Sequence, residues 1–299
     1  MYKKMIYWYK KYTPKFIQKI IKKITPKTFE YIKLDWLSNK NIDFSGHGEI
    51  QAIKRFLQTN NGQNNFYVDI GASDGVSSSS TLEFAKNTNW KGLSIEFDKK
   101  KFSKMKYVYR KYKNVRLANS KVTPENVGKL FRQYSVPKNP TFINIDIDSY
   151  DLDVFNSIII AGYLPDIVSI EINEKIPPPI YFKVLYEEKH FWRGDHFYGC
   201  SISAAQKEFS KKGYILGDFK LNNAIFINKS IYPDIKEIDT VTAYNNGYRD
   251  VPNRKNLFKY NHDVEVLFNL NNLEKIKFLN NLFLPYEGIY ELKVVTNDE

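Results

Sequence analysis

Short runs of apolar, β-branched and aromatic residues alternate with longer amphipathic stretches through the middle of the chain. Such alternation is typical of a parallel β-sheet whose strands are joined by crossover helices. The pattern predicts seven strands, at 66–70, 92–96, 114–118, 141–146, 166–172, 213–218 and 224–228. It predicts helices at 49–57, 77–86, 99–110, 124–134, 151–160 and 201–211.

The connection between the last two predicted strands is too short for a crossover helix, so these strands should pair antiparallel. A plain dinucleotide-binding sheet continues with parallel strands instead. We therefore expect an α/β, Rossmann-like domain over residues 30–230, with a seven-stranded, mostly parallel sheet and an antiparallel last strand. A small C-terminal extension over 231–299 should hold a helix at 270–284 and a strand at 288–295.

The first 29 residues contain nine Lys and no acidic residue. A helix that starts at Thr13 and Pro14 would place its apolar residues on one face until Pro26 ends it. Two interpretations stay open: residues 1–27 attach to anionic lipid, or the helix packs on the domain or on a partner. No apolar run reaches the ~18 residues that span a bilayer, so we expect a cytoplasmic protein with peripheral membrane contact at most.

The net charge of +12 changes this picture little. The bases are 38 Lys and only 7 Arg, in a chain also rich in Asn, Ile, Tyr and Phe, as an AT-rich genome would encode. Because guanidinium groups suited to base edges and phosphates are scarce, we do not expect a nucleic-acid partner. One cysteine, Cys200, excludes an intrachain disulfide and a Cys-based zinc site.

The first predicted strand runs into a loop with candidate cofactor-binding residues, Asp69, Gly71, Ser73 and Gly75. Glycine at such a turn lets the backbone approach a ligand closely. The spacing is Gly-x-x-x-Gly rather than the Gly-x-Gly-x-x-Gly of pyrophosphate-binding loops. A carboxylate just before the first glycine would oppose a pyrophosphate and suits a cofactor that carries an ammonium group.

Further cofactor candidates follow the next strands. Glu96 ends the second strand, where a carboxylate can accept both ribose hydroxyls. Asn119, after the third strand, could meet the adenine edge, and Asp146 ends the fourth.

Acidic and amide side chains also gather at the ends of the fourth and fifth strands. Asp148 lies on the same side of its strand as Asp146, and Glu171 and Asn173 end the neighbouring strand. Such oxygen ligands suit Mg²⁺, so Asp148, Glu171 and Asn173 form a candidate metal site. Without a metal, an acid such as Asp148 would act as general base, or the acids would bind substrate. The alternative is that Asp148 and Asp151 only cap the following helix.

Two features follow the fifth predicted strand: a wall beside the site and a polar and aromatic run. Three prolines at 177–179 predict a stiff, extended segment. A polar and aromatic run follows, which fits a sugar-like acceptor, and its members are His190, Trp192, Asp195, His196 and Tyr198. Of the two histidines we take His196 as the candidate catalytic base.

These motifs together resemble the FkbM-like and related glycan-modifying class I methyltransferases of bacteria. The resemblance rests on the segments 145–151, 170–173, 177–179, 198–201 and 223–227 and covers about 160 residues, from 67 to 228. It departs from the family pattern at Ser73, where a second glycine is usual, and at Cys200, where alanine is usual.

The resemblance implies that the chain uses S-adenosylmethionine, with Asp69, Gly71 and Glu96 as cofactor residues. It also implies O-methylation of a sugar, a glycan or another small polar acceptor. The alternative is a catalytically inactive protein of this fold that binds a partner at a membrane surface. An NAD-dependent enzyme is disfavoured by the glycine spacing.

Overall fold

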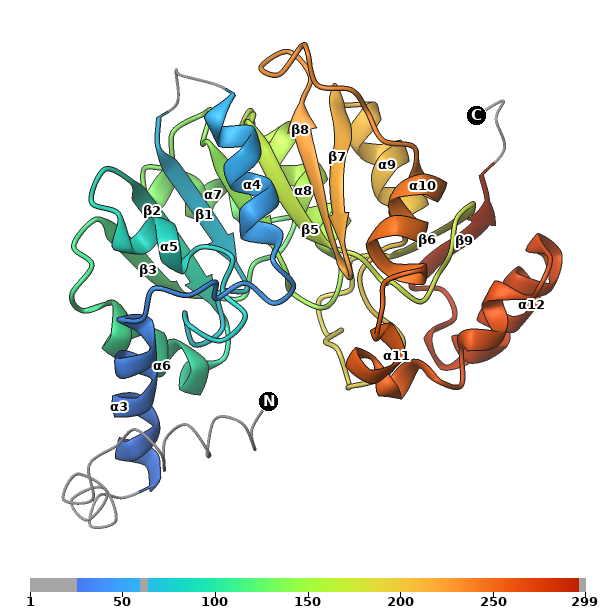
Figure 1. The fold of residues 1–299 in the computed structure, drawn as a ribbon, viewed down its shortest axis with the longest axis horizontal. Helices are drawn as coiled ribbons and strands as arrows, with labels where there is room; N and C mark the ends of the chain where they lie inside the picture. The colour runs from blue at the N-terminus through green and yellow to red at the C-terminus, as the bar shows by residue number, and fades with distance from the viewer. Residues whose placement is uncertain (1–25, 60–63, 296–299) are drawn as a thin grey trace.

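The computed structural model describes residues 26–59 and 64–295, which build a large sheet, a small sheet and the helices around them (Figure 1). The large sheet has the strand order β3-β2-β1-β4-β5-β8-β7. Its strands are β1 (Phe66–Ile70), β2 (Lys91–Glu96), β3 (Val115–Asn119), β4 (Phe142–Ile145), β5 (Ile167–Glu171), β7 (Tyr214–Lys220) and β8 (Asn223–Asn228). The first five pair in parallel, whereas β8 lies antiparallel between β5 and β7. This confirms the predicted α/β, Rossmann-like fold with a seven-stranded, mostly parallel sheet and an antiparallel last strand.

Helices cover both faces of this sheet. On one face lie α4 (Glu49–Gln58), α5 (Leu82–Lys86) and α6 (Lys99–Tyr109); on the other lie α7 (Val127–Gln133), α8 (Asp151–Ile160) and α9 (Ile202–Ser210). Because side chains alternate along a strand, Val68 and Ile70 pack on the α8 side and Tyr67 packs on the α4 side. Coverage on both faces explains why every residue of β1 is buried.

The helix predicted at 77–86 was wrong in its first half. Helix α5 begins only at Leu82, and the residues before it form turns. Asp74 accepts hydrogen bonds from the backbone N–H groups of Val76 and Ser77, and Ser79 Oγ accepts one from Leu82 N. Short polar side chains that bond nearby backbone compete with helix formation. The serine run is therefore a loop after β1.

The proline-rich stretch holds a strand that the sequence analysis missed. Strand β6 (Ile180–Val184) pairs antiparallel with β9 (Tyr290–Val294) in the small sheet. The three prolines at 177–179 form a turn into β6 rather than an extended wall. Since the partner strand is more than a hundred residues away in sequence, as in the pair Ile180 and Val294, no local pattern announces the pairing.

The helix and the strand predicted in the C-terminal extension are both present. Helix α12 (Asn272–Leu282) begins with a capping box between Asn271 and Glu274, and β9 follows it. Between β8 and α12 lie shorter helices: α10 (Thr240–Tyr244), a π-helix at Asn245–Arg249, α11 (Arg254–Leu257), and 3₁₀ turns at Lys259–Asn261 and Glu265–Phe268; another turn, Leu284–Tyr286, follows α12. The π-helix and α10 contact β7, so this region packs directly on the large sheet.

Helix α3 (Pro26–Ser38) lies against α6 at the opposite end of the molecule from α12 and β9 (Figure 1). The helix predicted to begin at Thr13 lies outside the described residues. Among the residues that are described, no helix is both long enough and apolar enough to cross a membrane.

Candidate functional site

A cavity of about 670 Å³ opens at the carboxyl ends of the central strands. The loops after β1, β2, β3 and β4 line it, together with Glu171 at the end of β5 and the segment 190–192. Seven residues predicted for the site line this cavity: Asp69, Gly71, Ser73, Glu96, Asp146, Asp148 and Glu171. Four others, Gly75, Asn119, Asn173 and His196, do not. The predicted edge of the sheet is therefore where the cavity lies.

Two glycines make the loop after β1 possible. Gly71 has φ +92°, and a Cβ there would lie 1.7 Å from the carbonyl oxygen of Asp146. Gly75 has φ +76°, and its Cβ would lie 2.7 Å from Tyr109 Cε1 on α6. The first glycine lets the loop cross the end of β4, and the second lets α6 pack beneath the loop. Gly75 thus shapes the site without facing it.

Asp69 is buried at the base of the cavity, and both of its carboxylate oxygens have partners. Thr81 Oγ1 donates to Oδ2 at 2.5 Å, and Asn144 Nδ2 donates to Oδ1 at 3.0 Å from the neighbouring strand. Burial raises the pKa of Asp69, although these two hydrogen bonds act in the opposite direction. Asp69 therefore joins β1, β4 and the serine loop at the cavity floor.

Glu96 lies at the end of β2 with its carboxylate oriented by backbone. Its oxygens accept hydrogen bonds from Ser73 N at 2.8 Å and from Asp98 N at 2.6 Å. Asn119, which was predicted to meet adenine, instead donates from Nδ2 to the carbonyl oxygens of Glu96 and Phe97. These two hydrogen bonds let Asn119 hold the loop after β2. After β3 the cavity is lined by residues 120–122 instead of Asn119.

Three carboxylates converge at the ends of β4 and β5. One oxygen from each of Asp146, Asp148 and Glu171 lies within 4.8 Å of the others. Asp151 shapes the loop that carries Asp148, because its oxygens accept hydrogen bonds from Ile147 N and Ser149 N. Asp148 itself has φ +55°, a conformation that few non-glycine residues adopt. The structure therefore shows no helix cap by either aspartate: the residue before α8 is Tyr150, Asp151 bonds backbone that precedes the helix, and Asp148 lines the cavity.

Burial and mutual repulsion disfavour the state in which all three carboxylates are ionised at once. Burial, followed by the charges of neighbouring carboxylates, raises the pKa values of Asp146 and Glu171 well above their usual range. Burial also raises the pKa of Asp148, against the opposing effect of Lys101 and Lys175. Such a set is stabilised by protons or by a cation.

Unsatisfied oxygen atoms mark the same region. Asn144 Oδ1, Ser149 Oγ and Glu171 Oε2 are buried and have no hydrogen-bond partner in the described part of the chain, and all three residues line the cavity. Buried polar atoms of this kind are costly unless a ligand, an ion or water completes them. The lining also carries six acidic residues against two lysines, although the whole chain is basic. The cavity therefore favours a cationic ligand with hydrogen-bond donors.

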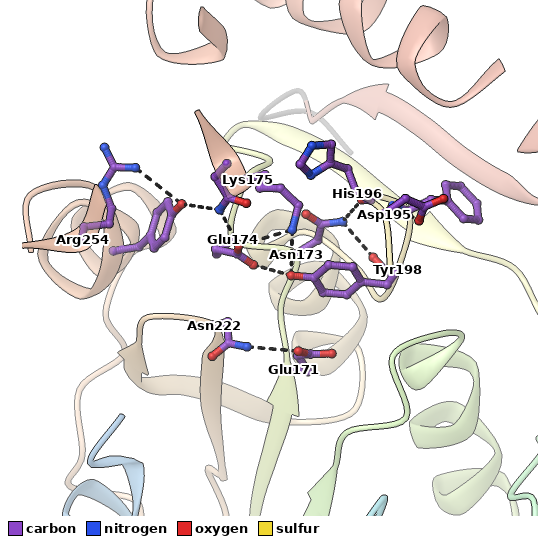
Figure 2. Close-up of polar contacts among 12 residues, drawn as sticks. Glu171, Asn173, Glu174, Lys175, Asp195, His196, Tyr198, Asn222 and Arg254 are labelled. Carbon is purple, nitrogen blue, oxygen red and sulfur yellow. Dashed lines mark hydrogen bonds and ion pairs between the residues drawn. The ribbon is translucent and has the colours of Figure 1, made fainter. Parts of the chain in front are cut away.

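Asn173 does not join the carboxylates. Its Nδ2 donates to the carbonyl oxygens of His196 and Tyr198, both at 2.9 Å (Figure 2). The candidate metal set predicted from the sequence thus changes, because Asp146 takes the place that Asn173 was given. The reason is geometric: Asn173 lies beyond the end of β5 and faces the loop 196–198.

A buried ion pair that the sequence analysis missed lies just after β5. Glu174 and Lys175 are 0% and 4% exposed, and Lys175 Nζ also donates to Tyr198 Oη at 2.8 Å (Figure 2). Asn261, from the C-terminal extension, donates to Glu174 Oε1 at 2.7 Å. Burial would raise the pKa of Glu174, but Lys175, Tyr198 and Asn261 together lower it. This network ties the extension to the strand that carries Glu171.

His196 is placed away from the cavity, which contradicts its predicted position. Its Nε2 lies 3.1 Å from Asp263 in the C-terminal extension. His190 lines the cavity instead and packs edge-on against Phe197 and Tyr286. Burial and the nearby Arg193 lower the pKa of His190, which favours its neutral imidazole. A loop has no regular alternation of side chains, so its sequence does not tell which of two histidines points into the cavity. Here the contact between His196 and Asp263 of the C-terminal extension holds His196 away from it.

No protein-family model matches the chain, and no curated protein matches it. Among solved structures, the N-terminal domain of EvdMO1 in the presence of SAH and D-fucose is 9% identical, with a TM-score of 0.41, and covers 69% of this chain and 97% of its own. A candidate caffeoyl-CoA O-methyltransferase from Staphylococcus aureus is 16% identical, with a TM-score of 0.41 and coverages of 72% and 98%. A candidate O-methyltransferase from Klebsiella pneumoniae is 12% identical, with a TM-score of 0.37 and coverages of 74% and 94%. Similarities of this size leave the chemistry to be inferred from the cavity of this chain.

Proposed function

We propose that the chain is an S-adenosylmethionine-dependent O-methyltransferase that acts on a sugar, a glycan or another small polar acceptor. The observation that carries the proposal is the arrangement around the cavity. The loop after β1 crosses the end of β4 at Gly71, and Glu96 lies at the end of β2. Three carboxylates at the ends of β4 and β5 line the same cavity.

The cofactor would occupy the part of the cavity between the β1 loop and the end of β2. Bound there, S-adenosylmethionine supplies an electrophilic methyl group. Glu96, with one backbone donor on each oxygen, keeps lone pairs for the ribose hydroxyls. The unpartnered Asn144 Oδ1 is an acceptor for the ammonium group, beside the negative charge of Asp69. The acidic lining as a whole attracts a ligand with a positive sulfonium and ammonium.

The acceptor hydroxyl would lie against the carboxylates at the ends of β4 and β5. A divalent cation such as Mg²⁺ fits between Asp146, Asp148 and Glu171, where it would offset their repulsion and increase the acidity of a hydroxyl. In the absence of a cation, Asp148 would accept the hydroxyl proton as the methyl group passes from sulfur to oxygen, because it lines the cavity. In that cation-free case, burial raises the pKa of Asp148, which makes its carboxylate a stronger base.

Aromatic side chains at the mouth support a sugar-like acceptor. Phe191 and Trp192 line the cavity and are 65% and 40% exposed, so their ring faces are available. Apolar ring faces next to hydrogen-bonding groups are a common arrangement for polar ring-shaped ligands. The acidic lining disfavours a polyanionic acceptor such as nucleic acid.

Calorimetry with adenosylhomocysteine and with NAD tests the cofactor part. Adenosylhomocysteine should bind, NAD should not, and Glu96→Gln should weaken binding because a neutral amide offers one acceptor oxygen in place of two. Binding of NAD in preference to adenosylhomocysteine would refute the proposal.

The acceptor side is tested by manganese binding, followed by paramagnetic resonance, and by methyl transfer to a panel of sugars. Asp148→Asn and Glu171→Gln should each lose manganese binding and transfer while still binding adenosylhomocysteine. The control is Asp153→Asn, because Asp153 pairs with Lys183 outside the cavity. Wild-type transfer in both cavity variants would place the chemistry elsewhere; no transfer to any sugar by wild-type protein, with adenosylhomocysteine bound, would favour a binding role.

We also propose that residues 1–27, with nine Lys and no acid, contact anionic lipid. These residues lie largely outside the described part of the chain. If they attach the protein, deleting them should weaken its binding to anionic vesicles.

A further inference from the structure

Helix α6 exposes a row of basic side chains. Lys99, Lys106 and Arg110 are exposed and follow one another at spacings of seven and four residues, which places them along one side of the helix. Lys113, also exposed, follows in the turns after the helix. Residues 99–113 contain eight bases and no acid. Among the described residues, Lys99, Lys106 and Lys113 form no ion pair, so their charge is available to a partner.

Helix α3 adds an apolar side to this row. It packs beside α6 through an ion pair between Asp35 and Arg110 and a ring contact between Tyr31 and Tyr107. Directly after Asp35, Trp36 is 49% exposed, and Ile32, one turn earlier, is 37% exposed. The Asp35–Arg110 pair therefore joins the exposed side of α3 to the basic row of α6.

We propose that this α3–α6 face (Ile32, Trp36, Lys99, Lys106, Arg110 and Lys113) docks on an anionic lipid membrane. Lysines attract acidic headgroups, and an exposed tryptophan with an isoleucine one turn away enters the apolar layer just below them. A nucleic acid would use the charge but would leave Ile32 and Trp36 in water. The proposal rests on described residues only and does not depend on methyl transfer.

Docking in this way would also orient the cavity. Helix α6 begins at Lys99, next to Asp98, which lines the cavity and caps the helix by accepting from Lys100 N and Lys101 N. The basic row thus starts at the cavity mouth. A membrane on this face would lie beside the opening rather than behind the sheet.

Co-sedimentation of the full chain with vesicles tests the charge. Vesicles of phosphatidylcholine with added phosphatidylglycerol should bind the wild-type protein, and phosphatidylcholine alone should not. The triple variant Lys99→Glu, Lys106→Glu, Lys113→Glu should bind at least about tenfold more weakly. The control triple variant Lys212→Glu, Lys236→Glu, Lys277→Glu makes the same charge change at exposed lysines elsewhere and should bind clearly more tightly than the first. Equal weakening in the two triples would overturn the proposal.

A fluorescent probe tests whether this face is the one that meets lipid. The single native cysteine, Cys200, is buried, so an introduced surface cysteine can be labelled selectively. A polarity-sensitive dye at Ile32→Cys should shift to the blue with anionic vesicles, and the same dye at Leu273→Cys, on α12, should not. An unshifted Ile32 probe on sedimented protein, or tighter binding to nucleic acid than to vesicles, would overturn the proposal. Adenosylhomocysteine binding by the lysine variants should be unchanged, which separates this result from the proposed catalysis.

Discussion

At the scale of single residues, the cavity depends on backbone positions that tolerate no side chain. Gly71 combines a positive φ with a direct approach to the carbonyl oxygen of Asp146. A methyl group would have to move the end of β4, which carries the carboxylates. Gly213 also has a positive φ, of +81°, but a Cβ there would have no atom within 4 Å. These two glycines separate the cost of the conformation from the cost of the contact.

Gly71→Ala should therefore lower the free energy of unfolding by more than about 3 kcal/mol and abolish adenosylhomocysteine binding. Gly213→Ala should cost only the conformational part, about 1–2 kcal/mol, and keep binding. Urea denaturation and calorimetry measure both quantities. Equal losses in the two variants would mean that the approach to Asp146 is unimportant.

Asp166, which precedes β5, gives a pH-dependent prediction. It is 6% exposed, and burial raises its pKa to about 7. In the unfolded chain the group titrates near 3.8. A raised pKa in an acid means that ionisation penalises the folded state. The penalty is absent below about pH 4, grows as the pH rises and is complete above about pH 7.

Asp166→Asn should remove this penalty. We expect the variant to exceed wild type in stability by on the order of 2 kcal/mol at pH 8 and by little near pH 4. Thermal denaturation across this range gives the comparison, with the exposed Asp234→Asn as control. A gain that is the same at both pH values would contradict the assigned cause.

At the scale of elements, the pair Glu174–Lys175 joins the end of β5 to the C-terminal extension. Glu174 accepts from Asn261 through its side chain and from Tyr244 through its carbonyl oxygen. Asn173 meanwhile holds the 196–198 loop. The end of β5 therefore fixes two segments that lie far away in the sequence.

Lys175→Met should lower stability by about 3–5 kcal/mol, because it leaves Glu174 buried without its cation. The double variant with Glu174→Gln should recover much of this loss. Lys211→Met, which breaks an exposed pair with Glu208, should cost less than about 1 kcal/mol. Urea denaturation measures both losses in the free energy of unfolding. If the loss in Lys175→Met is no larger than that in Lys211→Met, the buried pair does not stabilise the fold as proposed.

At the scale of the whole molecule, the extension and the sheet should unfold together. Strand β9 completes the small sheet with β6, and α10 and the π-helix pack on β7. In hydrogen exchange, the amides of β9 and β4 should therefore have nearly the same free energy of opening when exchange takes place through global unfolding. Protection of β9 lost well before that of β4 would indicate an independent extension.

Most of the strands and their burial could be predicted from the sequence, because both follow from local patterns, whereas the order of the strands in the sheet came from the tertiary structure. The runs at β1 to β5 are apolar over a strand's length, and the short β7–β8 connection forces an antiparallel pair. The serine run after Gly75 was the exception, since its side chains bond nearby backbone and prevent the first turns of the predicted helix.

The residues that face the cavity were predictable where a strand end fixes their direction. Glu96 and Glu171 end their strands, Asp69 lies one residue before the end of β1, and Asp146 and Asp148 lie in the loop directly after β4, so all five converge on one edge of the sheet. The sequence by itself therefore determined the fold and the acidic, glycine-turned cavity.

Only the tertiary structure decided what depends on contacts between distant segments. Asp263 pairs with His196 outside the cavity, and Tyr286 packs edge-on against His190. Asn261 donates a hydrogen bond to the buried carboxylate of Glu174. Each partner comes from the C-terminal extension, whose position follows from the β6–β9 pairing across the chain. Periodicity along the sequence reports which side of an element is buried, but it does not report which distant side chain will meet it there.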